Sequence, residues 1–427
     1  MVMNRRIWSF LDSNNLIKDT QHGYIKGKST LTAAYQFIQN IILDIDKNKI
    51  ILGIFLDLTQ AYDCLDHSIL LSKLERYGIR GPALSWIESY LNNRKQKVKL
   101  SNLKMTTHSN EITTTIGVPQ GSILGPTLFI IFMNDIDNCI KCQACRITKY
   151  ADDTNLLITA TNQETLYVEG TNSMKNIQKW LSDNKLILNE NKTTAMFFRT
   201  AQCKKGVPNI LNFSENTIPI SANIRFLGLE LDSQLKWDYH INYLRGKLSN
   251  VCYSIKIVAN YLDKKVLKVI YHSNFESRLR FGILFFGNCG DFADIFVIQK
   301  RTLRHILGMN LGESCRGKFR ELGILTATGV FIQECIIYLF KNKQLFAGYE
   351  PTSGYTRVFN YIYPKHRLAL VEKGPQYTCL KLFNQLPNKL KEIDNLRLFK
   401  KKLYKLLLRL EPYKLEDFFN MNLNIML

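Results

Sequence analysis

The sequence contains no apolar run long enough to cross a bilayer, which would need about 20 residues. Its most apolar stretches are 50–58 and 128–133. No apolar core follows residues 1–6, so we expect no secretory leader. The ten cysteines also lack the even spacing of a disulfide framework. We therefore expect an intracellular, reduced protein, nuclear or cytoplasmic, without a membrane span.

Several catalytic constellations are missing as well. No Ser-His-Asp or Cys-His arrangement for nucleophilic catalysis can be identified in the sequence. Residues 27–29 read Gly-Lys-Ser, but a P-loop also needs an earlier glycine at fixed spacing and a preceding apolar strand. Internal repeats and low-complexity linkers are absent. The sequence therefore supports neither a triad hydrolase nor a P-loop nucleotide-binding protein.

Acidic residues are scarce, since 36 Asp and Glu stand against 57 Lys and Arg, a formal net charge of +21. Net charge informs about partners rather than fold. A polyanion held in a basic groove explains this charge best, and a basic solvated surface is the alternative. The 427 residues, 46% of them hydrophobic, can bury a large core and should form two or three packed units.

Hydrophobic periodicity predicts a mixed α/β chain. A buried strand over 50–56 should deliver Asp57 at its end. Further elements are predicted as helices over 68–92, an exposed basic strand over 94–100, a buried helix over 128–133, a strand pair around 150–153, an amphipathic helix ending near 183–184, and strands around 194–198 and 226–231. Residues 236–280 read as helical with nine Lys/Arg against three Asp/Glu, which suits a phosphate backbone. The rest is mostly helical.

Two carboxylate sites carry the strongest chemical signal. Asp57 follows one apolar strand, and Asp152-Asp153 lies beside another. Carboxylates there are costly to bury unless they are paired or coordinate a cation, so a shared metal site is the economical explanation. Taken alone, Asp-Asp could equally be a turn.

Five motifs in the expected order resemble those of reverse transcriptases. They are the first, second, third and fourth palm motifs at 55–63, 117–126, 150–153 and 186–193, and the primer-grip motif at 226–229. Residues 21–24 with 27–30 resemble a fingers motif, and 382–387 are similar to the region after the polymerase. The sequences of these motifs are most similar to those of jockey-like LINE elements, which are non-long-terminal-repeat (non-LTR) retrotransposons.

The resemblance implies a two-metal site. Asp57 and Asp152 would bind both magnesium ions, with Mn²⁺ as a substitute, the Leu58 carbonyl would be a backbone ligand, and Asp153 would support the site. Magnesium takes only one or two carboxylates besides waters and phosphates, so few protein ligands suffice.

The resemblance also implies nucleotide-binding and primer-binding residues. Tyr62 would be the steric gate against a 2′-hydroxyl, the alternative being a core tyrosine. Gln120 and Gly121 would lie by the nascent base pair, although an ordinary turn fits equally. Lys192 would neutralise the triphosphate or donate a proton, although a solvated lysine fits nearly as well. Residues implied to position the primer end, against the alternative of a buried strand and turn, are Phe226, Leu227 and Gly228.

The expected fold is α/β, a right-hand polymerase with an antiparallel-sheet palm, partial fingers, a helical thumb and a helical C-terminal extension. The expected domains are 1–235 (fingers and palm), 236–310 (thumb) and 311–427 (extension). Its partners would be an RNA template, a DNA primer and deoxynucleoside triphosphates. An endonuclease domain and the first fingers segment are expected to be missing. The missing fingers segment favours one alternative to an active polymerase, a catalytically silent nucleic-acid-binding remnant. A maturase-like RNA chaperone is a further alternative.

The run Cys139, Cys142 and Cys145 suggests zinc at first sight. A structural zinc site needs four ligands, and the nearest further candidate, Cys203, lies far downstream. We therefore do not expect a zinc site there. The isolated cysteines, which we expect to be core or surface thiols, are Cys252, Cys289, Cys315, Cys335 and Cys379.

Overall fold

The chain folds into two compact units in the computed structural model, Met1–Ala222 and Asn223–Leu427. The structure describes all of residues 1–427 except 103–104, 201–209, 214–215, 351–359, 422 and 424–427. The predicted borders at 235/236 and 310/311 differ from this division, which assigns 223–235 to the second unit. The finer division into fingers, palm, thumb and extension stays a prediction.

The first unit combines helices with short strands. Its helices are α1 (Val2–Ser13), α2 (Thr30–Asp46), α3 (His67–Arg76), α4 (Pro82–Leu91), α5 (Gly125–Met133), the 3₁₀ helix η1 (Asn134–Cys139) and α6 (Gln163–Asp183). Its strands are β1 (Ile50–Leu56), β2 (Arg94–Gln96), β3 (Lys99–Ser101), β4 (Thr106–His108), β5 (Ile112–Thr114), β6 (Cys145–Tyr150), β7 (Asp153–Ala160), β8 (Thr194–Phe198), β9 (Ile210–Phe213) and β10 (Asn216–Pro219).

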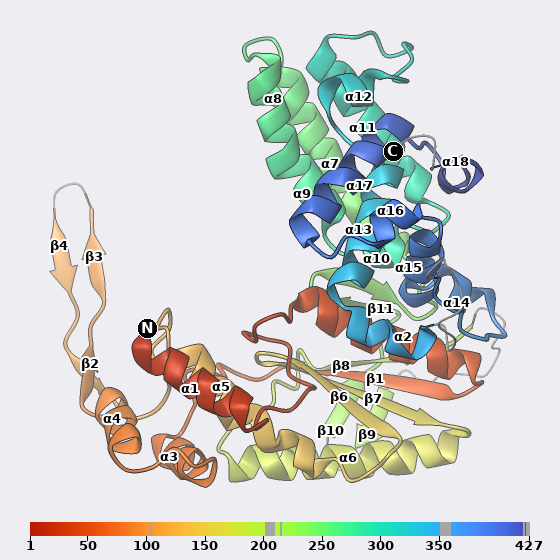
Figure 1. The fold of residues 1–427 in the computed structure, drawn as a ribbon. Coiled ribbons are helices and arrows are strands. Elements are labelled where there is room, and N and C mark those ends of the chain that lie inside the picture. Colours follow the sequence, from red (N-terminus) through yellow and green to blue (C-terminus); the bar gives the residue numbers. More distant parts are fainter. Residues whose placement is uncertain (103–104, 201–209, 214–215, 351–359, 422, 424–427) are drawn as a thin grey trace. The chain divides into compact units, whose positions relative to one another are not determined.

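A four-stranded antiparallel sheet, in the order β6-β7-β1-β8, forms the centre of this unit. Helices α2 and α6 cover its two faces (Figure 1). Six of the seven residues of β1 are buried, because a strand covered on both faces needs apolar side chains in both directions. The predicted α/β class with an antiparallel palm sheet is therefore confirmed.

Residues 27–30 begin a helix. Ser29 is the N-cap of α2 and accepts a hydrogen bond from the backbone N–H of Thr32, whose hydroxyl accepts one from the Ser29 N–H. This reciprocal arrangement satisfies two donors that a helix start otherwise leaves open. The Gly-Lys-Ser triplet thus acts as a turn and a helix cap.

Strands β2 to β5 form an exposed hairpin that we call the arm, residues 94–116, which extends from the rest of the first unit in Figure 1. The predicted single strand over 94–100 is interrupted after Gln96. Arg94 pairs with Thr114, whereas Lys99 pairs with His108, so the facing strand holds one extra residue between these pairs. That extra residue is a β-bulge, which the strand pattern alone does not reveal.

The second unit is mainly helical. Its elements are β11 (Asn223–Phe226), β12 (Leu229–Asp232), α7 (Asp238–Val258), α8 (Lys264–Ile270), the π-helix η2 (Tyr271–Glu276), α9 (Ser277–Arg280), α10 (Ile283–Phe286), α11 (Phe292–Leu307), α12 (Lys318–Leu322), α13 (Ala327–Lys341), the 3₁₀ helix η3 (Lys343–Tyr349), α14 (Ala369–Lys373), α15 (Pro375–Asn384), α16 (Asn388–Lys391), α17 (Leu396–Leu410) and α18 (Leu415–Asn420). None of the helices in the described ranges of either unit has both the length and the apolar content that a membrane span requires.

His240 on α7 provides a test of how this unit is packed. Its ring is 3% exposed, lies 4.6 Å from the Phe286 ring, and its Nδ1 accepts from the Glu230 N–H at 3.3 Å. Burial lowers the pKa of His240 to about 4. The unfolded chain takes up the proton first, so the free energy of unfolding should fall as pH drops from about 6.5 to about 4.

We expect this histidine to contribute up to about 3 kcal/mol of acid destabilisation. His240→Asn keeps an acceptor but cannot titrate, so thermal unfolding should lose less stability between pH 7 and 4.5 than in the unchanged chain. The exposed His108→Asn is the control and should behave like the unchanged chain. An equal loss in His240→Asn would contradict the buried, neutral assignment.

Candidate active site

Three aspartates come together at one end of the central sheet. In the β1–β7 ladder Leu56 pairs with Thr154, so Asp57 follows β1 at the edge where Asp153 begins β7. Asp152 occupies the turn just before it. Antiparallel pairing places the end of one strand beside the start of its neighbour, and this brings residues about a hundred positions apart into one site.

The turn between β6 and β7 presents Asp152. Tyr150 pairs with Asp153, which leaves Ala151 and Asp152 as a two-residue connection. Ala151 has φ +56° and is buried. A left-handed residue is what a two-residue hairpin requires, but a non-glycine residue there costs about 1 kcal/mol or more. Surrounding contacts must therefore hold this turn in place.

The acidic cluster brings several negative charges close together. Partial burial raises the pKa of Asp153 to about 6, and the negative charges of Asp152 and Asp57 add to the rise. One face of Asp153 is still exposed to solvent. The rise in its pKa therefore comes from the protein atoms packed around its other faces. Like charges within a few ångströms disfavour ionisation, and a bound cation would reverse that effect.

The chemistry of these donors fits magnesium. All are carboxylate or carbonyl oxygens, the ligands that hard divalent cations prefer. Within the described ranges, no three His, Cys, Asp or Glu side chains are grouped closely enough to hold an ion by themselves. An ion here would thus take one or two carboxylates and complete its shell with other oxygens, which is the usual habit of magnesium.

The fourth motif packs alongside the first. Leu58 forms a bridge with Leu188, the Asp57 carbonyl accepts from the Asn189 N–H at 2.8 Å, and Thr59 N–H donates to the Ile187 carbonyl at 2.9 Å. Leu58 lies between these two hydrogen bonds, and its own carbonyl takes part in neither.

Lys192 lies at the mouth of the acidic cluster. Its Nζ is 4.0 Å from Asp57 Oδ2, and 71% of the side chain is exposed. The following residue, Thr193, is fully buried and its Oγ1 accepts from the Asp57 N–H at 3.4 Å. Lys192 therefore has freedom to reach a ligand, while Thr193 fixes the backbone beneath it.

Tyr62 is half-buried beside the aspartates. Its ring stacks on Phe129, with centroids 4.2 Å apart and an interplanar angle of 20°. Burial raises the pKa of Tyr62, and the nearby Tyr24 hydroxyl and Asp152 carboxylate add to the rise. Tyr62 is thus a packed ring that also borders the acidic cluster. Tyr24, the last residue of the fingers-like motif 21–24, is 59% exposed with φ +54°.

The second motif docks onto the first through backbone hydrogen bonds. Val118 N–H donates to the Tyr62 carbonyl at 2.9 Å, and Gly117 N–H donates to the Leu65 carbonyl at 2.7 Å. Gly117 has φ +81°, and a Cβ there would lie 2.7 Å from the Asp63 carbonyl oxygen, so glycine is required. The exposed Gln120 donates to both Asp63 carboxylate oxygens at 2.9 Å, and Gly121 has φ +74°.

A strap formed by residues 20–23 clamps the Ala151 turn. The buried Gln21 Oε1 accepts from the N–H groups of Gly23 at 2.8 Å and Ala151 at 3.0 Å, while its Nε2 donates to the Ala151 carbonyl at 3.4 Å. A Cβ on Gly23 would stand 2.3 Å from the Ala151 nitrogen. The fingers-like motif therefore holds the turn that presents Asp152, a role that its sequence did not reveal.

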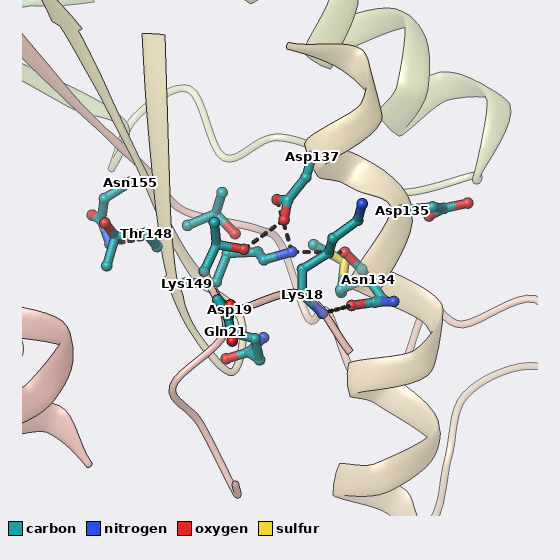
Figure 2. A network of polar contacts seen from close by, with 12 residues as sticks. Lys18, Asp19, Gln21, Asn134, Asp135, Asp137, Thr148, Lys149 and Asn155 are labelled. Carbon is teal, nitrogen blue, oxygen red and sulfur yellow. Dashed lines mark hydrogen bonds and ion pairs between the residues drawn. The ribbon is translucent and has the colours of Figure 1, made fainter. Parts of the chain in front are cut away.

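A buried ion pair supports the same strap from β6. Lys149 is fully buried, and its Nζ lies 2.9 Å from Asp137 Oδ1 on η1 (Figure 2). Thr20 Oγ1 donates to the other Asp137 oxygen at 2.5 Å. The Lys149 N–H donates a hydrogen bond to the Thr20 carbonyl at 2.8 Å. Burial lowers the pKa of Lys149, and Asp137 opposes the change. Removing one partner of such a pair costs about 3–5 kcal/mol.

The residues expected at the primer end lie in the second unit. Phe226 pairs with Leu229, so Leu227 and Gly228 form a two-residue turn with φ of +46° and +84°. Both values are positive, as a type I′ hairpin turn requires. The predicted strand over 226–231 is therefore interrupted by a turn at 227–228, and its residues 229–231 belong to β12. Phe226 is 3% exposed and a Cβ on Gly228 would stand 2.9 Å from the Phe281 ring.

The Cys139, Cys142 and Cys145 thiols do not form a metal site in the described part of the chain. Cys145 Sγ lies 3.2 Å from the Ser173 hydroxyl, and burial raises the pKa of this thiol to about 12. Cys203 lies outside the described residues.

Comparison with known proteins agrees with the motifs. The RNA-directed DNA polymerase from mobile element jockey of Drosophila melanogaster is 26% identical over 328 residues, 72% of this chain and 34% of that protein. The RNA-directed DNA polymerase assigned to transposon BS of the same species is 22% identical over 311 residues, 70% of this chain and 34% of that protein. The chain thus spans about a third of the length of these relatives.

Solved structures give a weaker likeness. The telomerase of Candida tropicalis aligns with a TM-score of 0.40 and 15% identity over 78% of this chain and 54% of that chain. The decisive match is in the sequence, because residues 1–231, more than half of the chain, match the family described as "Reverse transcriptase (RNA-dependent DNA polymerase)". Members of this family work with divalent metal ions. The chain belongs to the reverse transcriptase family, and its relatives are of the non-LTR, jockey-like type.

Proposed function

We propose that this chain is the RNA-directed DNA polymerase of a non-LTR retrotransposon and adds deoxynucleotides to a primer 3′-end. The observation that carries this proposal is the position of Asp57, at the end of β1, beside the Asp152-Asp153 turn. The raised pKa of Asp153 supports it, because partial burial and the neighbouring charges of Asp152 and Asp57 concentrate negative charge where bound cations would be stabilised.

Each residue of the site has a defined task in this proposal. When bound, two divalent cations activate the primer 3′-hydroxyl and neutralise the triphosphate. Asp57 and Asp152 would hold them, with the Leu58 carbonyl as a further ligand and Asp153 in support. Lys192, 4.0 Å from Asp57, would stabilise charge that develops on the phosphates. Gln120 and Gly121 would border the nascent base pair, and the 226–228 turn would position the primer.

Exposed basic and aromatic side chains on α7 fit a nucleic-acid partner. Tyr239, Tyr243 and Tyr253 are 52%, 38% and 64% exposed and recur at helical spacing. Lys247 Nζ lies 5.5 Å from the Tyr243 ring centroid. Aromatic faces flanked by lysine and arginine suit stacking and phosphate contact. We therefore propose RNA template, DNA primer and deoxynucleoside triphosphates as the partners.

A primer-extension assay tests this function. The purified chain should extend a DNA primer annealed to an RNA template with Mg²⁺, and also with Mn²⁺, and should stop when EDTA removes the metal. Binding to the same template and primer without extension would instead support the catalytically silent remnant. That outcome would refute polymerase activity while leaving the basic surfaces explained.

The proposed gate residue makes a separate prediction. Tyr62→Ala removes the ring that stacks on Phe129 and should weaken discrimination between deoxyribonucleotides and ribonucleotides about tenfold or more. Tyr62→Phe keeps the ring and is the matched control, with discrimination expected to stay unchanged. Single-nucleotide incorporation with paired dNTP and rNTP substrates measures the ratio. Equal ratios in all three proteins would remove the gate role.

A further inference from the structure

The base of the arm carries a stack of exposed aromatic and guanidinium groups. On α4 the Trp86 and Tyr90 rings are nearly parallel, with centroids 5.9 Å apart and an interplanar angle of 8°. The Arg94 guanidinium lies 5.5 Å from the Tyr90 ring centroid. Trp86 remains 43% exposed, although a tryptophan of this size is normally well buried. Flat, exposed π surfaces beside a cation are suited to stacking an unpaired base.

A row of lysines continues from this stack along the arm. Lys95 on β2, Lys97 just after β2 and Lys99 on β3 are all exposed. The Nζ atoms of Lys95 and Lys97 lie 3.8 and 3.6 Å from the same carboxylate, Glu111, so these two side chains lie on one side of the arm. Between residues 94 and 116 the sequence has five Lys/Arg and only this one acidic residue. The row therefore keeps an excess of positive charge.

A cavity links the arm to the candidate active site. Its volume is about 690 Å³, and its lining includes Arg94, Lys95 and Gln96 from the arm together with Asp63, Pro119 and Gln120. Gln120 donates to the Asp63 carboxylate, so both are fixed in the wall of this cavity. The residue proposed to border the nascent base pair thus shares one cavity with Lys95, the first lysine of the row.

We propose that this surface, comprising Trp86, Tyr90, Arg94 and the lysines at 95, 97 and 99, binds an unpaired nucleic-acid strand: the template on its way to the active site. The assignment rests on the proposed polymerase function for the identity of the strand. Bases would stack on Trp86 and Tyr90, and phosphates would lie along the lysine row. The chemistry recognises any unpaired strand, so RNA and DNA are both candidate ligands.

The lysine row is tested by equilibrium binding of the full chain in EDTA without nucleotides, so that catalysis plays no part. Fluorescence anisotropy with a single-stranded RNA, a single-stranded DNA of the same sequence and a blunt RNA–DNA duplex compares the ligands. Lys95→Ala/Lys97→Ala/Lys99→Ala should lower the log–log salt slope for single strands by about 2, since each phosphate contact contributes about 0.7. Duplex binding should change much less.

A matched control carries the same charge loss elsewhere on the first unit. Lys141→Ala/Lys175→Ala/Lys179→Ala also removes three exposed lysines and should leave the single-strand salt slope close to that of the unchanged chain. Trp86→Ala should weaken single-strand binding at least about fivefold, and Trp86→Phe should restore most of it. A common effect of both lysine triplets, or no effect of Trp86→Ala, would overturn the proposal.

The outcomes separate this inference from the polymerase proposal. The Lys95/Lys97/Lys99 triple variant and Trp86→Ala are together called the arm variants. If the unchanged chain fails to extend primers but the arm variants lose single-strand binding, the surface assignment stands and the polymerase assignment fails. If the chain extends primers while arm variants bind and extend like the unchanged protein, this inference is wrong and the polymerase assignment stands. A stronger effect with RNA than with DNA would identify the preferred strand.

Discussion

Asp152→Asn should reduce primer extension by at least about a thousandfold while leaving template and primer binding within about twofold. The substitution keeps the shape of the side chain and removes one negative charge from the proposed metal site. Asparagine is also well tolerated in turns, so the β6–β7 connection should keep its geometry. The expected loss therefore concerns the chemical step rather than folding. Single-turnover extension and anisotropy binding measure the two effects separately.

Asp183→Asn provides a matched charge change outside the cluster, because Asp183 is exposed at the end of α6 and is not among the charges that act on Asp153. Its extension rate should remain within about twofold of the unchanged chain, as for most surface substitutions. If Asp152→Asn extended primers as fast as this control, Asp152 could not be a ligand of an essential cation. The proposed assignment of the site would then be wrong.

Gly23→Ala should damage the same site from outside it. The added Cβ would stand 2.3 Å from the Ala151 nitrogen, closer than any tolerated contact, so either the strap or the turn must move. Displacing a catalytic turn by about an ångström can cost about a hundredfold in rate, and overpacking costs about 1–3 kcal/mol in stability. We expect a lower kcat with a KM for deoxynucleotides that changes little.

Gly290→Ala separates this effect from a general cost of replacing glycine. Gly290 is exposed, and a Cβ there would meet nothing within 4 Å. Thermal unfolding and extension of this control should match those of the unchanged chain. Full activity in Gly23→Ala would show that the strap does not position Asp152, whatever happened to stability.

Much of the site was predictable because its signals are local. Seven apolar residues followed by Asp57 predict a buried strand that ends in a carboxylate, and β1 has that form. The apolar run at 128–133 likewise predicts the buried helix α5. The prediction that Asp57 lies close to Asp152 and Asp153 came from the order of the motifs, which is a property of the family. No local pattern in the sequence indicated it.

The parts that were missed depend on contacts between distant residues. Gln21 belongs to the fingers-like motif 21–24, but only the fold shows that its amide contacts Ala151, 130 positions away. The bulge in the arm arises from unequal spacing on two facing strands, which neither strand shows alone. The hairpin at 226–229 was predicted as part of a strand, because positive φ at Leu227 has no signal in its side chain.

Binding of Mn²⁺ to the complex with primer, template and a non-hydrolysable deoxynucleotide tests the central claim most directly. Electron paramagnetic resonance should count two Mn²⁺ ions per chain in the unchanged protein, and both Asp57→Asn and Asp152→Asn should reduce that number or weaken the affinity at least about tenfold. Unchanged stoichiometry and affinity in both variants would mean that these carboxylates hold no cation.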